Sequence, residues 1–262
     1  MEFKSIGFIG GGRITRIMLH AFTNKHLRFS SITVCDTNEE VLENLRSEFP
    51  EIEVCNDPRK PAYKELVFVA LHPPAIVETL KNVVSSFTPN TIVVSLAPKI
   101  SIDKMIDILG TDNIVRMIPN ATSFINKGYN PVCFAREFPD HLKNAVLKML
   151  RTLGYTFETE EEKLESYAII SAMLPTYFWF QWDEMEKIGE KIGLNTRETK
   201  DAIRETLLAA VQLFYNPDMT HEEIMDLIPV KPVGDHEQNI RECFTSKLLP
   251  LFEKIRPEPT PA

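Results

Sequence analysis

The sequence contains little that would separate it from ordinary globular proteins of a reducing compartment. Its four cysteines are isolated and form no Cys-x-x-Cys pair, so neither a disulfide framework nor a zinc site is expected. The net charge is −8 and no basic stripe interrupts the mixed charges, which argues against a nucleic-acid partner. No apolar run approaches the roughly 20 residues of a membrane span, and the first residues lack the features of a signal peptide. We therefore expect a cytoplasmic protein without a membrane or nucleic-acid partner.

What the sequence does contain is a glycine-rich turn close to its start. An apolar run over residues 6–9 leads into Gly10, Gly11 and Gly12, and an amphipathic stretch over 13–22 follows. This order predicts a strand, a turn and a helix, as in a dinucleotide site, where the free N–H groups of the helix start face the phosphates. Thr15 stands where such sites have Gly or Ala, and its larger side chain is expected to press the helix away from the strand.

A second strand over residues 31–35 ends at an acidic residue, Asp36. It follows Gly12 by 24 positions, near the spacing of about 20 expected for a carboxylate that binds a ribose. Such a group accepts hydrogen bonds from the ribose hydroxyls and repels a 2′-phosphate. We therefore expect the protein to prefer NAD(H), with NADP(H) as the second choice. The alternative interpretation is that Asp36 caps a helix beginning near Asn38.

The chain changes character along its length. Its first part alternates apolar strands, at 65–71, 91–96, 113–117 and 131–135, with helices at 75–84, 101–109 and 141–153. This pattern predicts a parallel α/β sheet of the Rossmann type. Beyond residue 160 the pattern is helical. We assign residues 1–158 to a dinucleotide-binding domain, 159–256 to an all-α domain and 257–262 to a disordered tail.

The helical half is richer in large apolar side chains than a small bundle needs. They lie on the predicted helices 167–192 and 196–215 and include Phe178, Trp179, Trp182, Leu207, Leu208 and Phe214. These faces need a partner surface. The expected assembly is a homodimer formed through the helical domain, or a larger oligomer built from it.

Several short motifs occur in the same order as in one known family. They are Gly7 to Gly12, Leu71-His72-Pro73, Ser95-Leu96-Ala97, Arg116-Met117-Ile118-Pro119-Asn120, Gly128, Pro175-x-Tyr177, Gly189, Gly193-Leu194 and Thr206. Through them the chain resembles the pyrroline-5-carboxylate reductase family, as a divergent member, from about residue 4 to residue 255.

The resemblance implies a Rossmann domain joined to a helical dimerisation domain. It also implies an oxidoreductase that transfers a hydride from a reduced nicotinamide to a small carboxylated cyclic imine, as in proline biosynthesis. The cofactor-binding residues would be Gly10, Gly11, Gly12, Arg13, Ile14, Asp36, Leu71, His72, Pro73 and Ala97. For Arg13 and His72 the alternatives are a solvated helix residue and a loop histidine.

One segment departs from the family. The loop that holds the substrate carboxylate in the family, Ser-Pro-Gly-Gly-Thr-Thr, is Lys231-Pro232-Val233-Gly234-Asp235-His236 here. We expect Lys231, Val233, Gly234 and Asp235, with Asn120, to contact the substrate, and His236 to act as the general acid. In the alternative interpretation His236 is an exposed residue of a first helical turn, Asp235 is a helix cap, and Asn120 forms a turn.

The altered loop leaves two further functions open. One is an oxidoreductase of the same fold for another imino or keto acid, and the other is a nucleotide-binding regulatory protein without catalysis.

Two short runs combine residue types that bind metals: His221-Glu222-Glu223 and Asp235-His236-Glu237. Adjacent residues rarely converge on one ion, so no metal is expected.

Overall fold

The computed structural model describes residues 3–257, and the predicted disordered tail lies outside this range except for Pro257. Within it the first half of the chain forms one eight-stranded sheet, with the strand order β3-β2-β1-β4-β5-β6-β7-β8. The strands are β1 (Ser5–Ile9), β2 (Ser31–Cys35), β3 (Glu53–Cys55), β4 (Leu66–Val69), β5 (Ile92–Ser95), β6 (Ile114–Met117), β7 (Gly128–Phe134) and β8 (Gly154–Glu158). The predicted Rossmann-type α/β class is confirmed.

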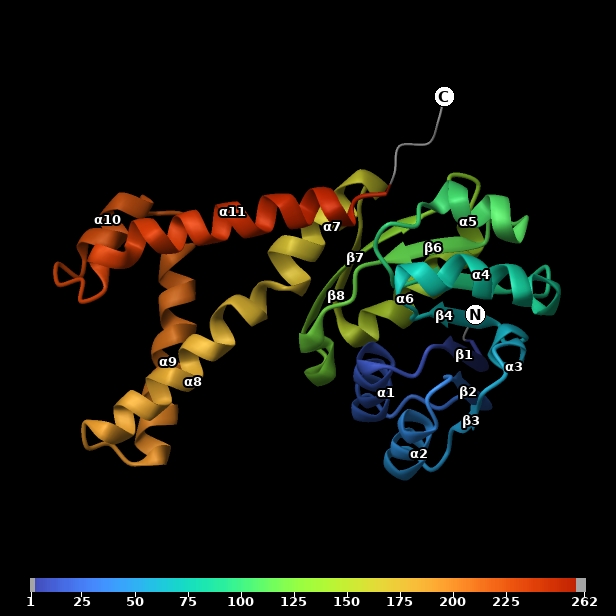
Figure 1. Ribbon diagram of the computed structural model, residues 1–262, viewed down its shortest axis with the longest axis horizontal. Helices are drawn as coiled ribbons and strands as arrows, with labels where there is room; N and C mark the ends of the chain where they lie inside the picture. The colour runs from blue at the N-terminus through green and yellow to red at the C-terminus, as the bar shows by residue number, and fades with distance from the viewer. Residues whose placement is uncertain (1–2, 258–262) are drawn as a thin grey trace. The chain divides into compact units, whose positions relative to one another are not determined.

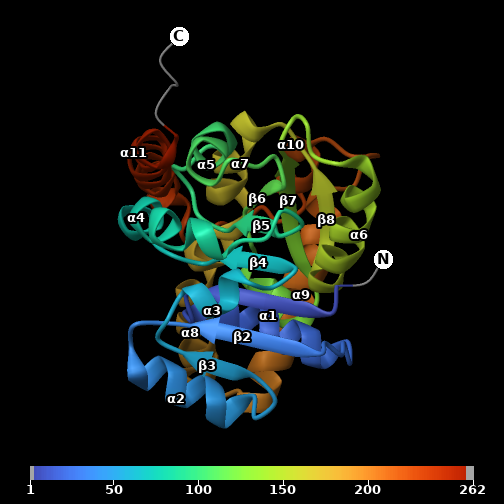
Figure 2. The same ribbon diagram turned by 90° about the vertical axis from the view of Figure 1, so that its right-hand side faces the viewer.

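Helices cover both faces of this sheet, as continuous apolar strands require. They are α1 (Arg13–Asn24), α2 (Glu39–Glu48), α3 (Arg59–Ala62), α4 (Pro73–Val83), α5 (Ile102–Leu109), α6 (Asp140–Leu150) and α7 (Leu164–Tyr167). Figures 1 and 2 show the strands side by side, with α4 and α5 on one side of the sheet and α6 on the other. All four residues of β4 and of β5 are buried.

The sheet is not wholly parallel. β7 pairs antiparallel with β6, while β8 returns parallel to β7. The connection from β6 to β7 covers residues 118–127 and contains only a short 3₁₀ turn, Ala121–Ile125. A parallel crossover takes roughly a dozen residues or more and usually a full helix, so this connection reverses the chain instead. The short strands β3 and β8 were not predicted from the sequence.

The chain divides into two compact units. Within the described residues, one contains 3–172 and 252–257, and the other 173–251. The segment 159–172, which we assigned to the helical half, is grouped with the sheet. It is fixed there by Arg116 on β6, whose guanidinium donates to Glu161 at 2.7 Å and to Glu165 at 2.5 Å.

The second unit is built from helices. They are α8 (Leu174–Lys191), α9 (Thr196–Phe214), α10 (His221–Asp226) and most of α11 (Glu237–Ile255). Pro175 lies in the first turn of α8, where its missing N–H costs nothing. Asn195 with Glu198, and Thr220 with Glu223, form capping boxes at the starts of α9 and α10. No helix of residues 3–257 is long and apolar enough to cross a membrane.

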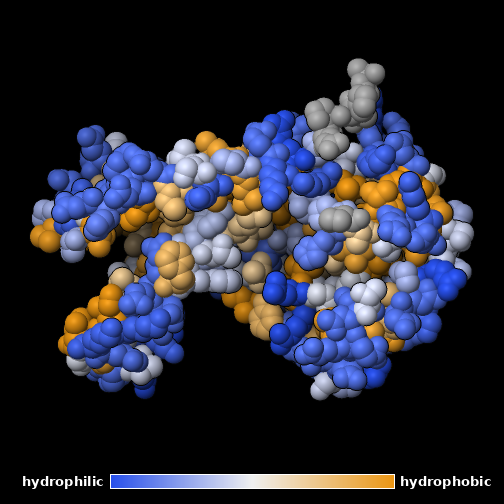
Figure 3. Space-filling view, in the orientation of Figure 1, coloured by the Kyte–Doolittle hydropathy of each residue, from blue (hydrophilic) through white to orange (hydrophobic). Residues whose placement is uncertain are grey.

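This helical unit has almost no core of its own. Between residues 173 and 251 only Gly189 and Thr199 are buried, and they touch each other where α8 meets α9: a Cβ on Gly189 would lie 2.4 Å from a Thr199 methyl. Large side chains stay open, among them Trp179 at 49%, Phe180 at 66% and Leu208 at 58% exposure. Apolar surface on this unit is orange in Figure 3.

Candidate functional site

The glycine-rich turn joins β1 to α1 against the end of β4. Gly10 has φ 107°, and a Cβ there would lie 2.4 Å from the carbonyl oxygen of Ala70. Only glycine fits this position without strain. Thr15 is fully buried, and its hydroxyl donates to the Gly10 carbonyl oxygen at 2.6 Å. The residue that departs from the usual pattern therefore has its polar group satisfied within the turn.

Asp36 follows β2 directly and is tied to the same turn. The Gly11 N–H donates to Asp36 Oδ2 at 2.7 Å, and the Asn38 N–H donates to Asp36 Oδ1 at 2.9 Å. An ionised carboxylate has about four lone-pair sites, so acceptor capacity remains for ribose hydroxyls. The cap of α2 is Asn38, whose side-chain oxygen accepts from Glu40 N at 3.0 Å. The interpretation of Asp36 as the helix cap was therefore wrong.

Helix α1 begins without a side-chain cap. Gly12 is its N-cap residue and offers no side chain, and its first turn contains no acidic residue. The first N–H groups of an uncapped helix, together with the positive end of its dipole, attract an anion. Arg13 is exposed in this first turn, while Ile14 packs partly against the sheet's core. The turn thus presents backbone donors and one cation together.

A cavity of about 680 Å³ borders the turn. Gly11, Gly12 and Arg13 form part of its wall with Val41 and Leu45 of α2 and with His72. The structure therefore brings four of the predicted cofactor residues to one hollow. Its volume lies within the range of small-molecule sites, roughly 300–1,000 Å³.

Sequence reasoning missed the charged pair at the rim of this cavity. Arg16 on α1 contacts Glu48 on α2 at 2.6 Å, and His20 contacts the same carboxylate at 2.7 Å. The hydrogen bond from Arg16 holds the pKa of Glu48 below its usual value. Since the partners lie 32 residues apart in the chain, no local pattern could have revealed the pair.

The remaining predicted cofactor residues follow neighbouring strands at the carboxyl edge of the sheet. A Cβ on Gly10 would lie 3.3 Å from a Leu71 methyl, so Leu71 adjoins the turn. His72 is the N-cap residue of α4 and Pro73 its first residue. Ala97, after β5, is 3% exposed. Two residues further on, Lys99 is exposed and has φ 73°, an uncommon conformation for lysine. The sequence did not predict this backbone conformation.

Asn120 lies in the sheet unit and its side chain is fully engaged. The amide nitrogen donates to the backbone oxygen and the hydroxyl of Ser171 at 3.1 and 3.2 Å. The amide oxygen accepts from Thr122 N at 2.9 Å. Asn120 caps the turn after β6 and is 5% exposed. The turn-forming interpretation is the one that this geometry matches.

The altered loop lies in the helical unit, ahead of α11. Gly234–His236 form a 3₁₀ turn, in which Gly234 N donates to Lys231 O at 3.0 Å and His236 N to Val233 O at 3.0 Å. The side chains of Lys231, Val233, Asp235 and His236 are exposed. Asp235 lies inside this turn, whose N-cap residue is Val233, and α11 begins only at Glu237, so the alternative prediction of Asp235 as a helix cap was wrong.

Comparison with known proteins places this chain beside one group of enzymes. The profile of a family described as NADP oxidoreductase, coenzyme F420-dependent, matches residues 5–99. A pyrroline-5-carboxylate reductase of Corynebacterium melassecola is 25% identical over 252 residues, which cover 95% of this chain and 93% of that protein. Pyrroline-5-carboxylate reductase 1 of Bacillus subtilis is 21% identical, over 93% and 77% of the two chains.

A solved structure extends the likeness to the fold. The pyrroline carboxylate reductase of Plasmodium falciparum, crystallised with NADP bound, superposes with a TM-score of 0.81 at 19% identity and covers 98% of each chain. Its coverage includes both the sheet unit and the helical unit. The resemblance inferred from the motifs is therefore confirmed: this chain is similar to the pyrroline-5-carboxylate reductases over nearly its whole length, as a divergent relative.

Proposed function

We propose that the protein is a nicotinamide-dependent reductase of the pyrroline-5-carboxylate reductase type, acting on the C=N bond of a small carboxylated cyclic imine. The observation that supports a nicotinamide cofactor is the hydrogen bond between Gly11 and Asp36 beside the uncapped start of α1. A carboxylate and free amides at that place suit a ribose and a pyrophosphate. The names of the relatives support a small carboxylated cyclic imine as the substrate.

The chain's own contribution to the reaction is orientation and charge. The turn from Gly10 to Gly12 and Arg13 bind the phosphates, and Asp36 binds the ribose. The reduced nicotinamide supplies the hydride when it is bound. Lys231 would attract the substrate carboxylate, and the exposed imidazole of His236 would give a proton to the imine nitrogen. The roles of Lys231 and His236 rest on their alignment with the family's substrate loop.

We further propose that NADH is preferred over NADPH. The Asp36 carboxylate is held in place by two backbone N–H groups, so it cannot turn away from a 2′-phosphate without losing them. Two like charges in contact weaken binding. Removing the charge with Asp36→Asn is expected to shift the NADH-to-NADPH affinity ratio toward NADPH by about tenfold, or 1.4 kcal/mol.

The assembly that we propose is a homodimer through the helical unit. A unit with only two buried residues between 173 and 251 cannot be stable through its own apolar contacts. A second copy offers the same exposed surfaces and forms a self-complementary interface. The four free cysteines support a reducing compartment, and we place the protein in the cytoplasm on that ground.

Reduction assays with purified protein test these proposals together. NADH and NADPH oxidation would be followed with pyrroline-5-carboxylate and with a panel of other imino and keto acids. Asp57→Asn is a matched control for Asp36→Asn, since Asp57 follows β3 at the same edge but bonds to Arg59 instead of the glycine turn. Activity only with a keto acid would favour the alternative oxidoreductase. Cofactor binding without turnover of any substrate would favour the regulatory protein.

A further inference from the structure

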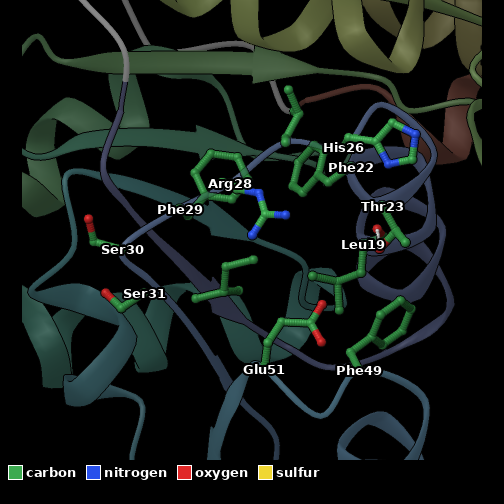
Figure 4. Close-up of a pocket in the computed structure, with 12 residues that line it drawn as sticks. Leu19, Phe22, Thr23, His26, Arg28, Phe29, Ser30, Ser31, Phe49 and Glu51 are labelled. Atoms are coloured by element: carbon green, nitrogen blue, oxygen red, sulfur yellow. Dashed lines mark hydrogen bonds between the residues drawn. The ribbon is translucent and has the colours of Figure 1, made fainter.

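A second cavity lies at the opposite end of the strands from the glycine turn. It measures about 470 Å³ and is bounded by the end of α1, the loop before β2, the first residues of β2 and the end of α2. Figure 4 shows its lining. β2 runs from Ser31 to Cys35, so this cavity and Asp36 are separated by the length of a five-residue strand, roughly 17 Å. The two cavities share no lining residue.

The shape of the cavity follows from how α1 ends. His26 has φ 53°, its N–H donates to Thr23 O at 2.9 Å, and the Leu27 N–H donates to Phe22 O at 3.0 Å. These are the two hydrogen bonds of a Schellman motif, in which glycine usually occupies the left-handed position. The chain is then held by the bond from Ser30 N to Lys4 O at 2.7 Å. This turn leaves a fixed hollow between the two helix ends.

The floor of the cavity is apolar. Leu19 and Phe22 are each 2% exposed and Phe49 is 4% exposed, and they belong to the main core of the sheet unit. The ring of Phe29 lies 5.6 Å from that of Phe22 and extends the same surface. A ligand with a branched or aromatic body would therefore rest on an apolar floor whose most accessible aromatic side chain is the partly exposed Phe29.

The rim carries charges of both signs. In Figure 4 the guanidinium of Arg28 and the carboxylate of Glu51 both point toward the middle of the cavity. Within residues 3–257 neither side chain forms an ion pair or a side-chain hydrogen bond. By contrast, Arg16 and Glu48, on the two helices that border the cavity, are paired at 2.6 Å. Unpaired opposite charges over one apolar floor are complementary to a ligand that carries both charges and an apolar body.

The helix ends distinguish the two charges further. α1 and α2 both end at this cavity, at Asn24 and Glu48; α2 has Arg46 in its last turn, whereas α1 has no basic residue there. The negative end of a helix dipole favours a cation. An ammonium group is therefore favoured near Glu51 and the helix ends, while Arg28 is the partner for a carboxylate.

We propose that this cavity binds a free α-amino acid with a large apolar side chain. Its carboxylate pairs with Arg28, its ammonium group with Glu51, and its side chain lies on Leu19, Phe22 and Phe49. The inference does not depend on the proposed reductase function, because none of its residues contacts the glycine turn or Asp36.

The test measures binding to the full-length protein by calorimetry with five probes. They are L-phenylalanine, L-leucine, 3-phenylpropionate, which lacks the ammonium group, phenethylamine, which lacks the carboxylate, and glycine, which lacks the side chain. Saturable binding of the two apolar amino acids is expected, with each of the other three at least about tenfold weaker. Equal binding of 3-phenylpropionate, or no saturable binding of either amino acid, would overturn the proposal.

Variants locate the bound ligand. Arg28→Gln and Glu51→Gln should each weaken phenylalanine binding about tenfold or more. The control variants Arg136→Gln and Glu43→Gln, at exposed residues outside the cavity lining, should not. Phenylalanine should leave NADH affinity unchanged. Competition with NADH, or binding that survives both rim substitutions, would place the ligand elsewhere and refute the assignment.

Discussion

The buried pair of Arg116 and Glu165 allows a quantitative test of the sheet unit. The two side chains are 1% and 2% exposed, and Arg116 Nη2 lies 2.5 Å from Glu165 Oε1. Arg116 also donates to Glu161, which is 24% exposed, while its Nε has no partner within residues 3–257. Glu165→Gln removes a charge that the buried guanidinium cannot replace with water. Breaking such a pair costs about 3–5 kcal/mol.

We expect Glu165→Gln to lose about 3 kcal/mol, the low end of that range, because the amide oxygen still accepts a hydrogen bond. For a chain of this size that loss lowers the melting temperature by roughly 6–12 °C. Glu161→Gln should lose less, about 1.5 kcal/mol, since water reaches this partly exposed position. The double substitution Arg116→Met with Glu165→Leu removes both buried charges and should recover most of the loss.

Urea unfolding at a fixed protein concentration measures these differences, because assembly would make stability depend on concentration. A loss below about 1 kcal/mol for Glu165→Gln would show that the pair is open to solvent or contributes nothing. A double variant no more stable than the single one would show that Arg116 is needed for a reason other than its charge partner. Either result would refute the reasoning.

Three further outcomes are expected. Leu208→Glu, at a side chain that is 58% exposed on α9, should convert a dimer to a monomer in light scattering, and an unchanged mass would contradict the proposed interface. The hydrogen bond to Arg16 lowers the pKa of Glu48, so the stability that this carboxylate adds to the folded protein is present above its usual pKa of 4.5 and is lost as the pH falls through the lower pKa of the folded state. The difference in melting temperature between wild type and Glu48→Gln should therefore shrink from pH 7 to about pH 3. A constant difference would contradict this. Burial and the neighbouring Cys55 raise the pKa of the Cys35 thiol to about 12, so iodoacetamide at about pH 8 should label it only after unfolding, and rapid labelling of the folded protein would refute that.

Much of the architecture could be predicted from local signals. The apolar runs that became β4 and β5 are buried on both faces, and a short continuous apolar run bounded by turn residues can be recognised in any short window. The capping boxes at Asn195 and Thr220 depend on residues three positions apart, so they too could be recognised locally. The approximate positions of the helices followed from the same kind of evidence.

The sequence predictions were incomplete or wrong where strand pairing and hydrogen bonding depend on more than the local sequence pattern. β3 and β8 are short and half-exposed, so they carry little apolar periodicity. The antiparallel direction of β7 depends on the length of the connection before it. The sequence alone leaves Asp36 open as a helix cap, because it does not show that Asn38, two residues later, accepts the capping hydrogen bond instead.

The sequence by itself determined the strand–turn–helix start, the acidic residue after the second strand, the change to helices and the excess of apolar side chains in the second half. Each of these depends on spacing or composition. Only the tertiary structure decided that Arg116 meets Glu165, 49 residues away, that Asn120 bonds to Ser171, that the helical unit buries almost nothing alone, and that two cavities open at opposite ends of the strands. Such features depend on segments distant in the chain meeting in space, and the free energy that selects those meetings comes from the whole packed core.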